Sequence, residues 1–383
     1  MKVVRTFHPV GQGAFYSERF YVDDDSQAKY NIVFDCGTSW GTILKAKKVV
    51  TQAFDKNDTI DYLFISHLDY DHVSLVNTLI ESVDKVKRIV LPLVNKNEVR
   101  FGINLNYIAN HQEAEAFLRW ILNRIDGNNN GIDIPITFIG SNDDKGNVTA
   151  GREKITLQIE EGAPEWVLMP CNISAMSRRK ELLERFDRML SDTDFREESI
   201  RRGLPVVGNG DELFHWLLDE RYVAEIINDK KLRKAVKSAY EKLTGGVNVN
   251  SLLLYSGPAR EGLYYMMYQM YSNNFKRMRF RRTGCLYTGD SDCDIDEWKD
   301  GIYSDVWQNI GTIQIPHHGS LKSFDLKKNS IDRVYYFPVS CGCTNSFGHP
   351  SGKVLAYLMK KDGLPHVVTE MANTVCMQEI VRC

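Results

Sequence analysis

The hexapeptide His67-Leu68-Asp69-Tyr70-Asp71-His72 decides the fold and the chemistry expected of this 383-residue chain. An apolar run at 62–65 precedes it and predicts a buried strand. Apolar residues at 73–83 follow it with the spacing of one helix face. The sequence therefore places the hexapeptide in a loop between the carboxyl end of a strand and the start of a helix.

The residue types in this loop indicate a metal site. In an extended loop His67, Asp69 and Asp71 point to one side, because side chains alternate, and His72 adds a ligand as the chain turns. Two imidazoles and two carboxylates this close together are costly to hold without a cation. The alternative interpretation is a helix N-terminus with capping acids and two incidental histidines.

Further short motifs end other apolar runs along the chain. They are Val10-Gly11-Gln12-Gly13, Asp35-Cys36-Gly37, Asn248-Val249-Asn250-Ser251-Leu252, Thr288-Gly289-Asp290, Pro316-His317-His318-Gly319-Ser320 and Gly348-His349-Pro350-Ser351. Together with the hexapeptide, and in this order, they resemble the metallo-β-lactamase fold superfamily. The branch they resemble most is the soluble hydrolase domain of ComEC-type DNA-uptake proteins. Asp69 stands where the superfamily usually has a second histidine, and Ala14 stands where the branch usually has Asp or Asn. The resemblance spans residues 1–95 and 245–383.

The resemblance implies an α/β fold, an αββα sandwich of two β-rich halves with helices outside. We expect one metallo-β-lactamase-fold domain over residues 1–383. Residues 174–244 have mixed charge and helical periodicity, which predicts a helical insertion within that domain. The insertion could cover the active site, bind a partner or simply pack on its host. Outside it, strands are expected within 2–37 and near 62–65, 88–93, 134–139, 155–159, 166–169, 251–255, 284–288, 312–315, 334–339 and 367–380, with a helix over 114–125.

The superfamily holds two metal ions that share a bridging carboxylate, and Asp290 occupies that position here. By the resemblance, one ion takes His67, Asp69 and Asp290. The other takes Asp71, His72, Asp290 and a histidine from the C-terminal third. The sequence does not rank the candidates for that histidine; we place His317 among the ligands and keep His318 and His349 as alternatives and as candidate proton donors.

The remaining roles follow from phosphoryl chemistry. Asp71 could orient the attacking hydroxide, and His318 or His349 could protonate the leaving oxygen. Ser320 could donate a hydrogen bond to phosphate, and Asn250 stands in a region where the superfamily has another histidine. Compared with zinc β-lactamases, oxygen donors replace nitrogen donors, which favours two Mn²⁺ or Mg²⁺ ions and leaves Zn²⁺ as the alternative.

A basic run at 276–282 is the strongest local signal for nucleic acid. It reads Lys276-Arg277-Met278-Arg279-Phe280-Arg281-Arg282, and it leads into the strand before Asp290, so we expect it at one end of that strand. Lys276, Arg277 and Arg279 could track a phosphate backbone. The alternative is an edge strand whose charges prevent aggregation.

Composition fits a soluble enzyme. Hydrophobic residues make up 43% and charged residues 26%, and the net charge of −2 means that any nucleic-acid site must be a local patch. No apolar run is long enough for a membrane span, and the N-terminus lacks the pattern of a signal peptide. The eight cysteines are expected to be reduced core residues, so we expect a cytoplasmic location without membrane contact.

The sequence thus predicts a metal-dependent hydrolase, most specifically a phosphodiesterase or nuclease acting on DNA or another nucleic acid. One alternative is a hydrolase of a small ester, lactone or nucleotide. Another is a metal-containing subunit without catalysis that docks a protein partner through the helices of 174–244.

Overall fold

The computed structural model describes residues 1–22, 27–94, 96–109, 114–127, 133–140, 153–162, 164–174, 176–241, 250–261, 264–270, 274–280, 282–327, 329–331 and 335–382. Of residues 40, 174, 176–179, 240, 241, 250, 264–270 and 274–280 only the backbone is described.

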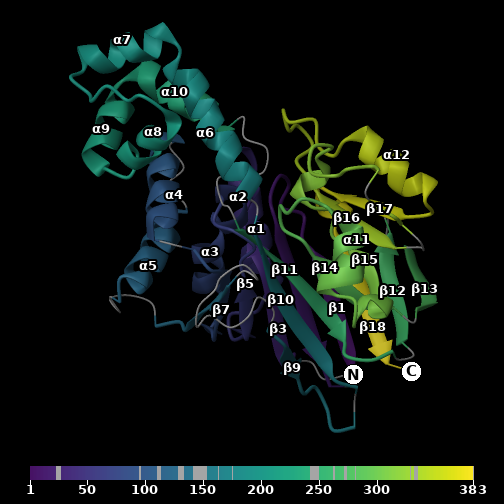
Figure 1. The fold of residues 1–383 in the computed structure, drawn as a ribbon. Helices are drawn as coiled ribbons and strands as arrows, with labels where there is room; N and C mark the ends of the chain where they lie inside the picture. The colour runs from purple at the N-terminus through teal and green to yellow at the C-terminus, as the bar shows by residue number, and fades with distance from the viewer. Residues whose placement is uncertain are drawn as a thin grey trace.

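Two large sheets form the centre of the molecule (Figure 1). The first has nine strands in the order β13-β12-β18-β1-β2-β3-β5-β7-β8. These are β1 (Lys2–Phe7), β2 (Phe15–Tyr21), β3 (Tyr30–Cys36), β5 (Tyr62–Phe64), β7 (Ile89–Pro92), β8 (Ile136–Ile139), β12 (Tyr264–Met270), β13 (Asn274–Phe280) and β18 (Cys376–Arg382).

The second sheet has seven strands in the order β17-β16-β15-β14-β11-β10-β9. They are β9 (Ile155–Leu157), β10 (Trp166–Ser174), β11 (Asn250–Pro258), β14 (Gly284–Tyr287), β15 (Ile310–Ile313), β16 (Tyr336–Ser340) and β17 (Leu364–Val368). The short strands β4 (Thr59–Ile60) and β6 (Lys85–Val86) pair separately. Single turns of 3-10 or π helix cover Trp40–Thr42, Trp298–Ile302, Trp307–Asn309, His317–Gly319 and Ala372–Thr374.

The two sheets pack face to face on a buried apolar core. Phe34 of β3 contacts Tyr287 of β14, with ring centroids 5.1 Å apart. Phe20 of β2 meets Trp166 of β10 edge-on at 5.5 Å. These rings fill the space between the sheets, so each sheet buries its inner face against the other.

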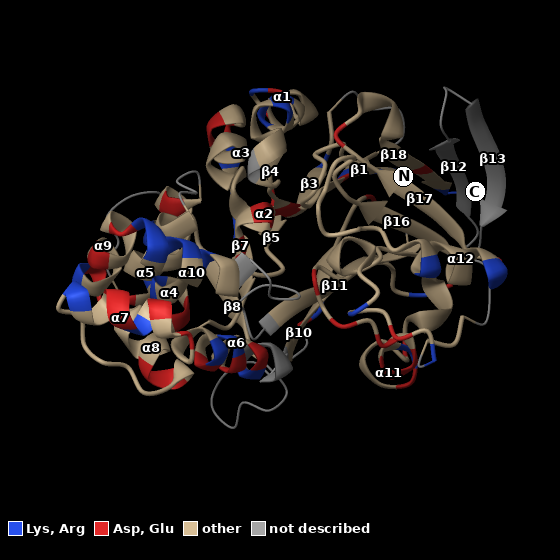
Figure 2. Ribbon diagram, turned by 90° about the horizontal axis from the view of Figure 1, so that it is seen from above, with Lys and Arg blue, Asp and Glu red and all other residues tan. Residues whose placement is uncertain are grey.

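The outer faces of both sheets are covered by helices, as Figure 2 shows from above. Alternation along the strands explains this: Leu63 points to the helices and Phe64 to the other sheet, and Leu253 and Leu254 divide in the same way. The first sheet is covered by α1 (Ile43–Ala53), α3 (Val76–Ser82) and α5 (Glu115–Ile125), and the second by α11 (Ile295–Glu297) and α12 (Gly352–Lys360). The predicted αββα sandwich is confirmed.

A bundle of helices stands beside the sandwich (Figure 1). It contains α6 (Met176–Leu190), α7 (Thr193–Arg201), α8 (Gly210–Trp216), α9 (Glu220–Asn228) and α10 (Lys230–Glu241), together with α4 (Lys96–Ala109). Phe101 of α4 packs against Phe214 of α8, with ring centroids 4.5 Å apart. The helices predicted for 174–244 are therefore present, but α4, which the sequence pattern did not predict, completes their core.

The single strand expected over 367–380 is wrong. The chain forms β17, which runs parallel to β16 in the second sheet, and then β18, which lies antiparallel between β1 and β12 in the first. A turn at Ala372–Thr374 carries the chain across. One apolar stretch thus contributes to both sheets, because each of its halves finds a buried neighbour.

Parallel strand pairs bring several loops to one edge of the sandwich. In the first sheet β3, β5 and β7 are parallel, and in the second β14, β15 and β16 are parallel. The carboxyl ends of parallel strands meet at the same edge of a sheet, where ligands commonly bind in α/β proteins. The motifs that follow β3, β5, β14, β15 and β16 are therefore close in space.

Within the described residues, the structure contains no helix both long enough and apolar enough to cross a bilayer.

Candidate metal centre

The predicted metal loop joins β5 to the short helix α2 (Tyr70–Val73), as the sequence indicated. Asp69 is the residue before α2, and Asp71 and His72 lie within it. Gly37, which follows β3, lets the loop pack tightly, because a Cβ at this position would lie 2.4 Å from the backbone oxygen of Asp71. The side chains of His67 and His72 are buried, with ring centroids 4.0 Å apart.

Asp290 approaches this loop from the second sheet. It follows β14 through Gly289, whose φ of 54° and missing side chain allow a close contact: a Cβ there would lie 2.5 Å from Cβ of Ser66. Gln314 fixes the turn, since its Oε1 accepts hydrogen bonds from the backbone N–H groups of Thr288 at 2.8 Å and Gly289 at 3.0 Å. His67 and Asp290, which are 223 residues apart in the chain, thus face one another.

Imidazole and carboxylate groups converge at this contact. Nε2 of His72 lies 3.2 Å from Oδ1 of Asp290, and Nε2 of His318 lies 3.1 Å from Oδ2 of Asp71. Two sets of three residues hold their ligand atoms within 4.8 Å of one another: His67, His72 and Asp290, and Asp71, His72 and His318. His72 belongs to both sets, so the two sets form one continuous cluster.

Hydrogen bonds outside the cluster set the direction of its imidazoles. Nδ1 of His72 donates to Oδ2 of Asp35 at 2.8 Å, and Nδ1 of His318 donates to the backbone oxygen of Ser340 at 2.9 Å. The hydroxyl of Ser66 donates its single proton to Asp35, so it accepts from Nδ1 of His67 at 2.9 Å. In the neutral form of each ring Nε2 is therefore the lone-pair nitrogen, and this is the form that binds metal.

The burial and the partners of these Nε2 atoms fit a metal ion. Within the described part of the chain, Nε2 of His67 is buried without a hydrogen-bond partner, and Nε2 of His72 is buried with the carboxylate of Asp290 3.2 Å away. A buried polar atom without a partner is costly, and a cation would satisfy both nitrogens and the carboxylates beside them. The mixed nitrogen and oxygen donors suit a divalent transition metal.

The charged groups of this cluster shift one another's pKa values. Burial lowers the pKa of His72, but the carboxylates of Asp290 and Asp35 outweigh it and raise that pKa well above its ordinary value. Burial raises the pKa of Asp290, but His72, His317 and His318 outweigh it and hold that pKa well below its ordinary value. The pKa of Asp71 falls to about 2, because the hydrogen bond from His318 and the charge of His72 outweigh burial.

Backbone strain is concentrated at the same place. Of the four described non-glycine residues with positive φ, three are in or beside the cluster: Asp35 (56°), His317 (50°) and His318 (54°). Such conformations cost of order 1–3 kcal/mol each and are typical of functional sites. The turn directs the two adjacent histidines differently, since Nδ1 of His317 bonds Oγ of Ser323 at 2.7 Å while His318 bonds Ser340.

The other predicted ligands lie around the cluster. Oδ2 of Asp69 is 3.4 Å from Nε2 of His67, and Nε2 of His317 is 3.9 Å from Oδ2 of Asp290, but neither residue belongs to the two compact sets. His349 is half-buried, with its ring centroid 5.5 Å from that of His317 and 6.3 Å from that of His318. Burial and the two neighbouring histidines lower its pKa to about 4. Ser320 is buried, and its backbone N–H donates to the backbone oxygen of His317 at 2.9 Å.

The predicted substrate-binding side chains of Asn250, Lys276, Arg277 and Arg279 lie outside the described residues. The backbone places residues 276–280 of the basic run in β13, an edge strand, as the alternative interpretation had it. Five strands separate β13 from β5 in the sheet order. The chain also enters β14 from the run at the amino end of that strand, whereas Asp290 follows its carboxyl end.

Sequence reasoning missed the residues that orient the ligands. Asp35 is fully buried and accepts hydrogen bonds from the backbone N–H of Ser66 at 2.6 Å and from His72. Ser323 and Gln314 were missed as well. For Asp35 a signal existed, since it ends a predicted strand in an Asp-Cys-Gly motif, but the sequence does not reveal that its partner is His72.

Comparisons with known proteins agree with this site. Residues 21–96, which contain the metal loop, match the metallo-beta-lactamase superfamily. These residues are therefore similar to a superfamily whose members are generally metal-dependent hydrolases. Among solved structures, a beta-lactamase domain protein from Burkholderia ambifaria is similar at 20% identity and a TM-score of 0.21. The match covers 43% of this chain and 44% of that one. Curated proteins give no match.

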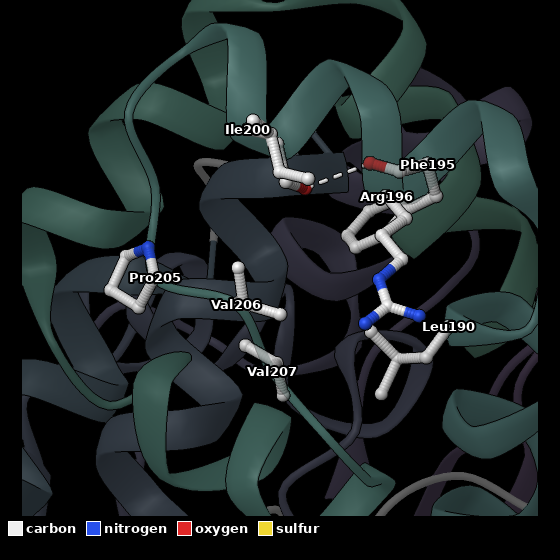
Figure 3. Close-up of a pocket in the computed structure, with 8 residues that line it drawn as sticks. Leu190, Phe195, Arg196, Ile200, Pro205, Val206 and Val207 are labelled. Carbon is white, nitrogen blue, oxygen red and sulfur yellow. Dashed lines mark hydrogen bonds between the residues drawn. The ribbon is translucent and has the colours of Figure 1, made fainter.

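A separate apolar pocket lies in the helical bundle, between the end of α6, α7 and the loop that follows α7 (Figure 3). Ile200 and Val206 line it and are 56% and 60% exposed. Arg196 also lines it. None of the residues that line this pocket belongs to the metal cluster.

Proposed function

We propose that the protein is a metal-dependent phosphodiesterase that cleaves nucleic acid. The observation that carries this proposal is the cluster itself, in which three imidazole Nε2 atoms and the carboxylates of Asp71 and Asp290 face one another at the carboxyl ends of two sets of parallel strands. The likeness to ComEC-type hydrolase domains rests on sequence motifs alone, and it supports the choice of a phosphodiester as the substrate.

His67, His72, His318, Asp71 and Asp290 would hold the metal. A bound divalent ion would supply Lewis-acid activation of water and would offset the charge of the phosphoryl group. Three imidazoles among the donors favour Mn²⁺ or Zn²⁺ over Mg²⁺, which prefers oxygen ligands. His72 belongs to both sets, but its Nε2 atom can bind only one ion. A second ion would therefore depend on Asp71 and His318, with the carboxylate of Asp290 shared between the two ions.

The chain's own residues would position the substrate and move protons. In the hydrolysis, water adds to phosphorus and releases a proton, the bond from phosphorus to the leaving oxygen breaks, and that oxygen takes up the proton that the water released. Asp71, whose pKa of about 2 keeps it ionised, would accept a hydrogen bond from the attacking water. His349, with a pKa near 4, is neutral at neutral pH and would hydrogen-bond the phosphate rather than act as the acid.

The test is cleavage of labelled single-stranded and double-stranded DNA by metal-stripped protein, with Mn²⁺, Mg²⁺ and Zn²⁺ restored separately. The informative variant is Asp290→Asn, and the matched control is Asp362→Asn, an exposed aspartate outside the cluster. Cleavage that needs metal, disappears in Asp290→Asn and persists in Asp362→Asn supports the proposal. Hydrolysis of small esters alone, by protein that binds metal, would replace it with the small-molecule alternative.

The exposed apolar pocket in the bundle supports a second proposal, that the helices of 174–244 dock a protein partner. The double variant Ile200→Asp, Val206→Asp is then expected to abolish the cellular function while leaving metal-dependent cleavage unchanged. If docking alone matters, Asp290→Asn retains the cellular function. If catalysis alone matters, the pocket variant retains it and Asp290→Asn does not.

A further inference from the structure

Phe347 is an exposed aromatic side chain beside the metal cluster. It is 58% exposed, whereas His317 and His318 nearby are only 7% and 5% exposed. Its ring lies against that of His349, with centroids 5.8 Å apart and planes inclined by 29°. The ring of His349 in turn lies 6.3 Å from that of His318, inclined by 24°. A row of roughly parallel rings therefore leads from solvent to the cluster.

The side chain of Asn345 connects the two ends of the loop that presents Phe347. Nδ2 of Asn345 donates to the backbone oxygens of Gly342 at 2.7 Å and His349 at 2.6 Å. Its Oδ1 accepts from the backbone N–H groups of Phe347 at 3.2 Å and His349 at 3.0 Å. Four hydrogen bonds from one amide fix the loop in a single arrangement, so the exposed ring is preorganised.

Contacts between loops fix this arrangement relative to the metal cluster. The backbone N–H of Ser351 donates to the oxygen of Gly319 at 2.9 Å. A Cβ at Gly319 would lie 2.7 Å from Cβ of Pro350, so the loop of His349 packs directly on the turn of His317 and His318. The loop that carries Phe347 is thus held beside the turn of the two histidines, with the ring of Phe347 exposed to solvent.

We propose that Phe347 is a stacking platform for an unpaired nucleobase next to the cleaved phosphodiester. This inference rests on the proposed function and adds a substrate class to it, namely single-stranded nucleic acid or unpaired ends. An aromatic ring stacks on any base whose face is accessible, whereas a base inside a duplex already stacks on its neighbours. Phe347 would therefore favour unpaired strands without reading their sequence.

The experiment compares Phe347→Leu, which keeps an apolar side chain but removes the ring, with Phe347→Tyr, which keeps the ring. Substrates are a single-stranded oligonucleotide, an abasic oligomer with the same number of phosphates, and a closed circular duplex. Trp216→Leu removes an aromatic side chain of α8 in the bundle and serves as the control. Kinetics are measured with the metal that supports cleavage by the wild-type protein.

Phe347→Leu is expected to raise KM for the base-containing single strand roughly 5- to 150-fold, the range that stacking on one base produces, while kcat changes little. The abasic oligomer and the circular duplex are expected to be unaffected, and Phe347→Tyr is expected to restore the wild-type KM. An equal rise in KM on the normal and abasic strands would overturn the proposal, and so would no rise on either.

Binding separates this inference from the proposed function. Fluorescence anisotropy of the labelled single strand reports affinity without cleavage. If the wild-type protein cleaves nothing but Phe347→Leu still weakens binding of the base-containing strand alone, hydrolysis fails and the stacking platform stands. If the wild-type protein cleaves DNA and Phe347→Leu binds both strands like the wild type, the platform fails and the phosphodiesterase stands.

Discussion

Asp35 controls the metal centre without belonging to the predicted ligand set. Its carboxylate holds the loop after β5 through Ser66 and fixes His72 with Nε2 toward Asp290. Partners of this kind set the tautomer and the orientation of a metal-binding imidazole. The orientation of His72 therefore depends on a residue that lies outside the two compact sets.

Replacing Asp35 by Asn is expected to weaken metal binding by about 10- to 100-fold, the usual effect of losing such a partner. The amide keeps the size of the side chain but cannot accept hydrogen bonds on both sides. Isothermal titration of metal-stripped protein with Mn²⁺ and Zn²⁺ measures the effect. Asp362→Asn is the matched control, because Asp362 also has a positive φ but is exposed. Equal affinity in both variants would rule out the role given to Asp35.

His8 makes the stability of the fold depend on pH. Its side chain is buried, stacks on Phe15 and hydrogen-bonds Ser17, and burial lowers its pKa to about 3. The unfolded chain takes up a proton near pH 6.5 and the folded chain does not, so stability falls as pH drops from about 6.5 toward 3, by about 1.4 kcal/mol per pH unit.

In His8→Gln this contribution is expected to disappear. Below pH 6.5 the unfolding free energy of the wild type should therefore fall, relative to that of His8→Gln, by about 1.4 kcal/mol per pH unit. Urea denaturation between pH 7 and 4 measures it. His215→Gln, at an exposed histidine of α8, should keep the slope of the wild type. A wild-type slope in His8→Gln would contradict the assignment.

Residue types identified most of the cluster, but local sequence could not rank adjacent histidines. His317 and His318 are adjacent in the chain, and both have positive φ. Only the bonds to Ser323 and Ser340, from different parts of the chain, decide which ring meets Asp71. Asp35 was not assigned for the same reason, because its partner His72 lies 37 residues away.

At the scale of elements, apolar periodicity predicted most strands of the two sheets, but it missed β12, gave one strand where β17 and β18 lie, and failed for α4. This helix buries polar Asn104 and Asn106 as well as Phe101 and Leu105, so it shows no single apolar face. The amide of Asn104 donates to the backbone oxygen of Leu217 at 2.7 Å, a partner that lies in the bundle. A helix buried between two bodies has partners on several sides, and these partners cannot be inferred from its own sequence.

Removal of the bundle alone is expected to make the protein aggregate. Phe101, Leu105 and Ile108 are each at most 2% exposed, and replacing 176–241 by a short linker would expose all three. Size-exclusion chromatography should show oligomers for this deletion and a monomer when the three residues are also made polar. If the protein that lacks 176–241 is monomeric and its thermal unfolding is unchanged, the apolar side chains of α4 do not require the bundle for burial.

At the scale of the whole molecule, the site depends on how the two sheets are joined. Each sheet contributes part of the cluster: His67, Asp71 and His72 follow β5 of the first sheet, and Asp290 and His318 follow strands of the second. Motif order predicted the halves of the site, whereas their contact depends on the packing between the sheets. That packing includes a buried polar network as well as apolar rings.

Arg5 and Glu18 form the centre of this network. Nε of Arg5 donates to Oε1 of Glu18 at 2.6 Å within the first sheet. Tyr287 of the second sheet donates to the same oxygen at 2.9 Å, and Ser256 donates to the other carboxylate oxygen. Arg5 also donates to the backbone oxygen of Thr283 at 3.1 Å. Both charges are buried, so each requires the other.

Glu18→Ala is expected to lower the unfolding free energy by about 3–5 kcal/mol, because it leaves the guanidinium of Arg5 buried without its counter-charge. The double variant Arg5→Met, Glu18→Leu should recover most of that loss, since apolar side chains of similar size remove both charges together. Urea denaturation measures both, and Lys87→Met, which breaks the partly exposed pair with Asp61, should cost at most about 1 kcal/mol. If the double variant is as unstable as Glu18→Ala, the loss comes from the missing bonds to Tyr287 and Ser256, and the network joins the sheets through hydrogen bonds rather than through paired charge.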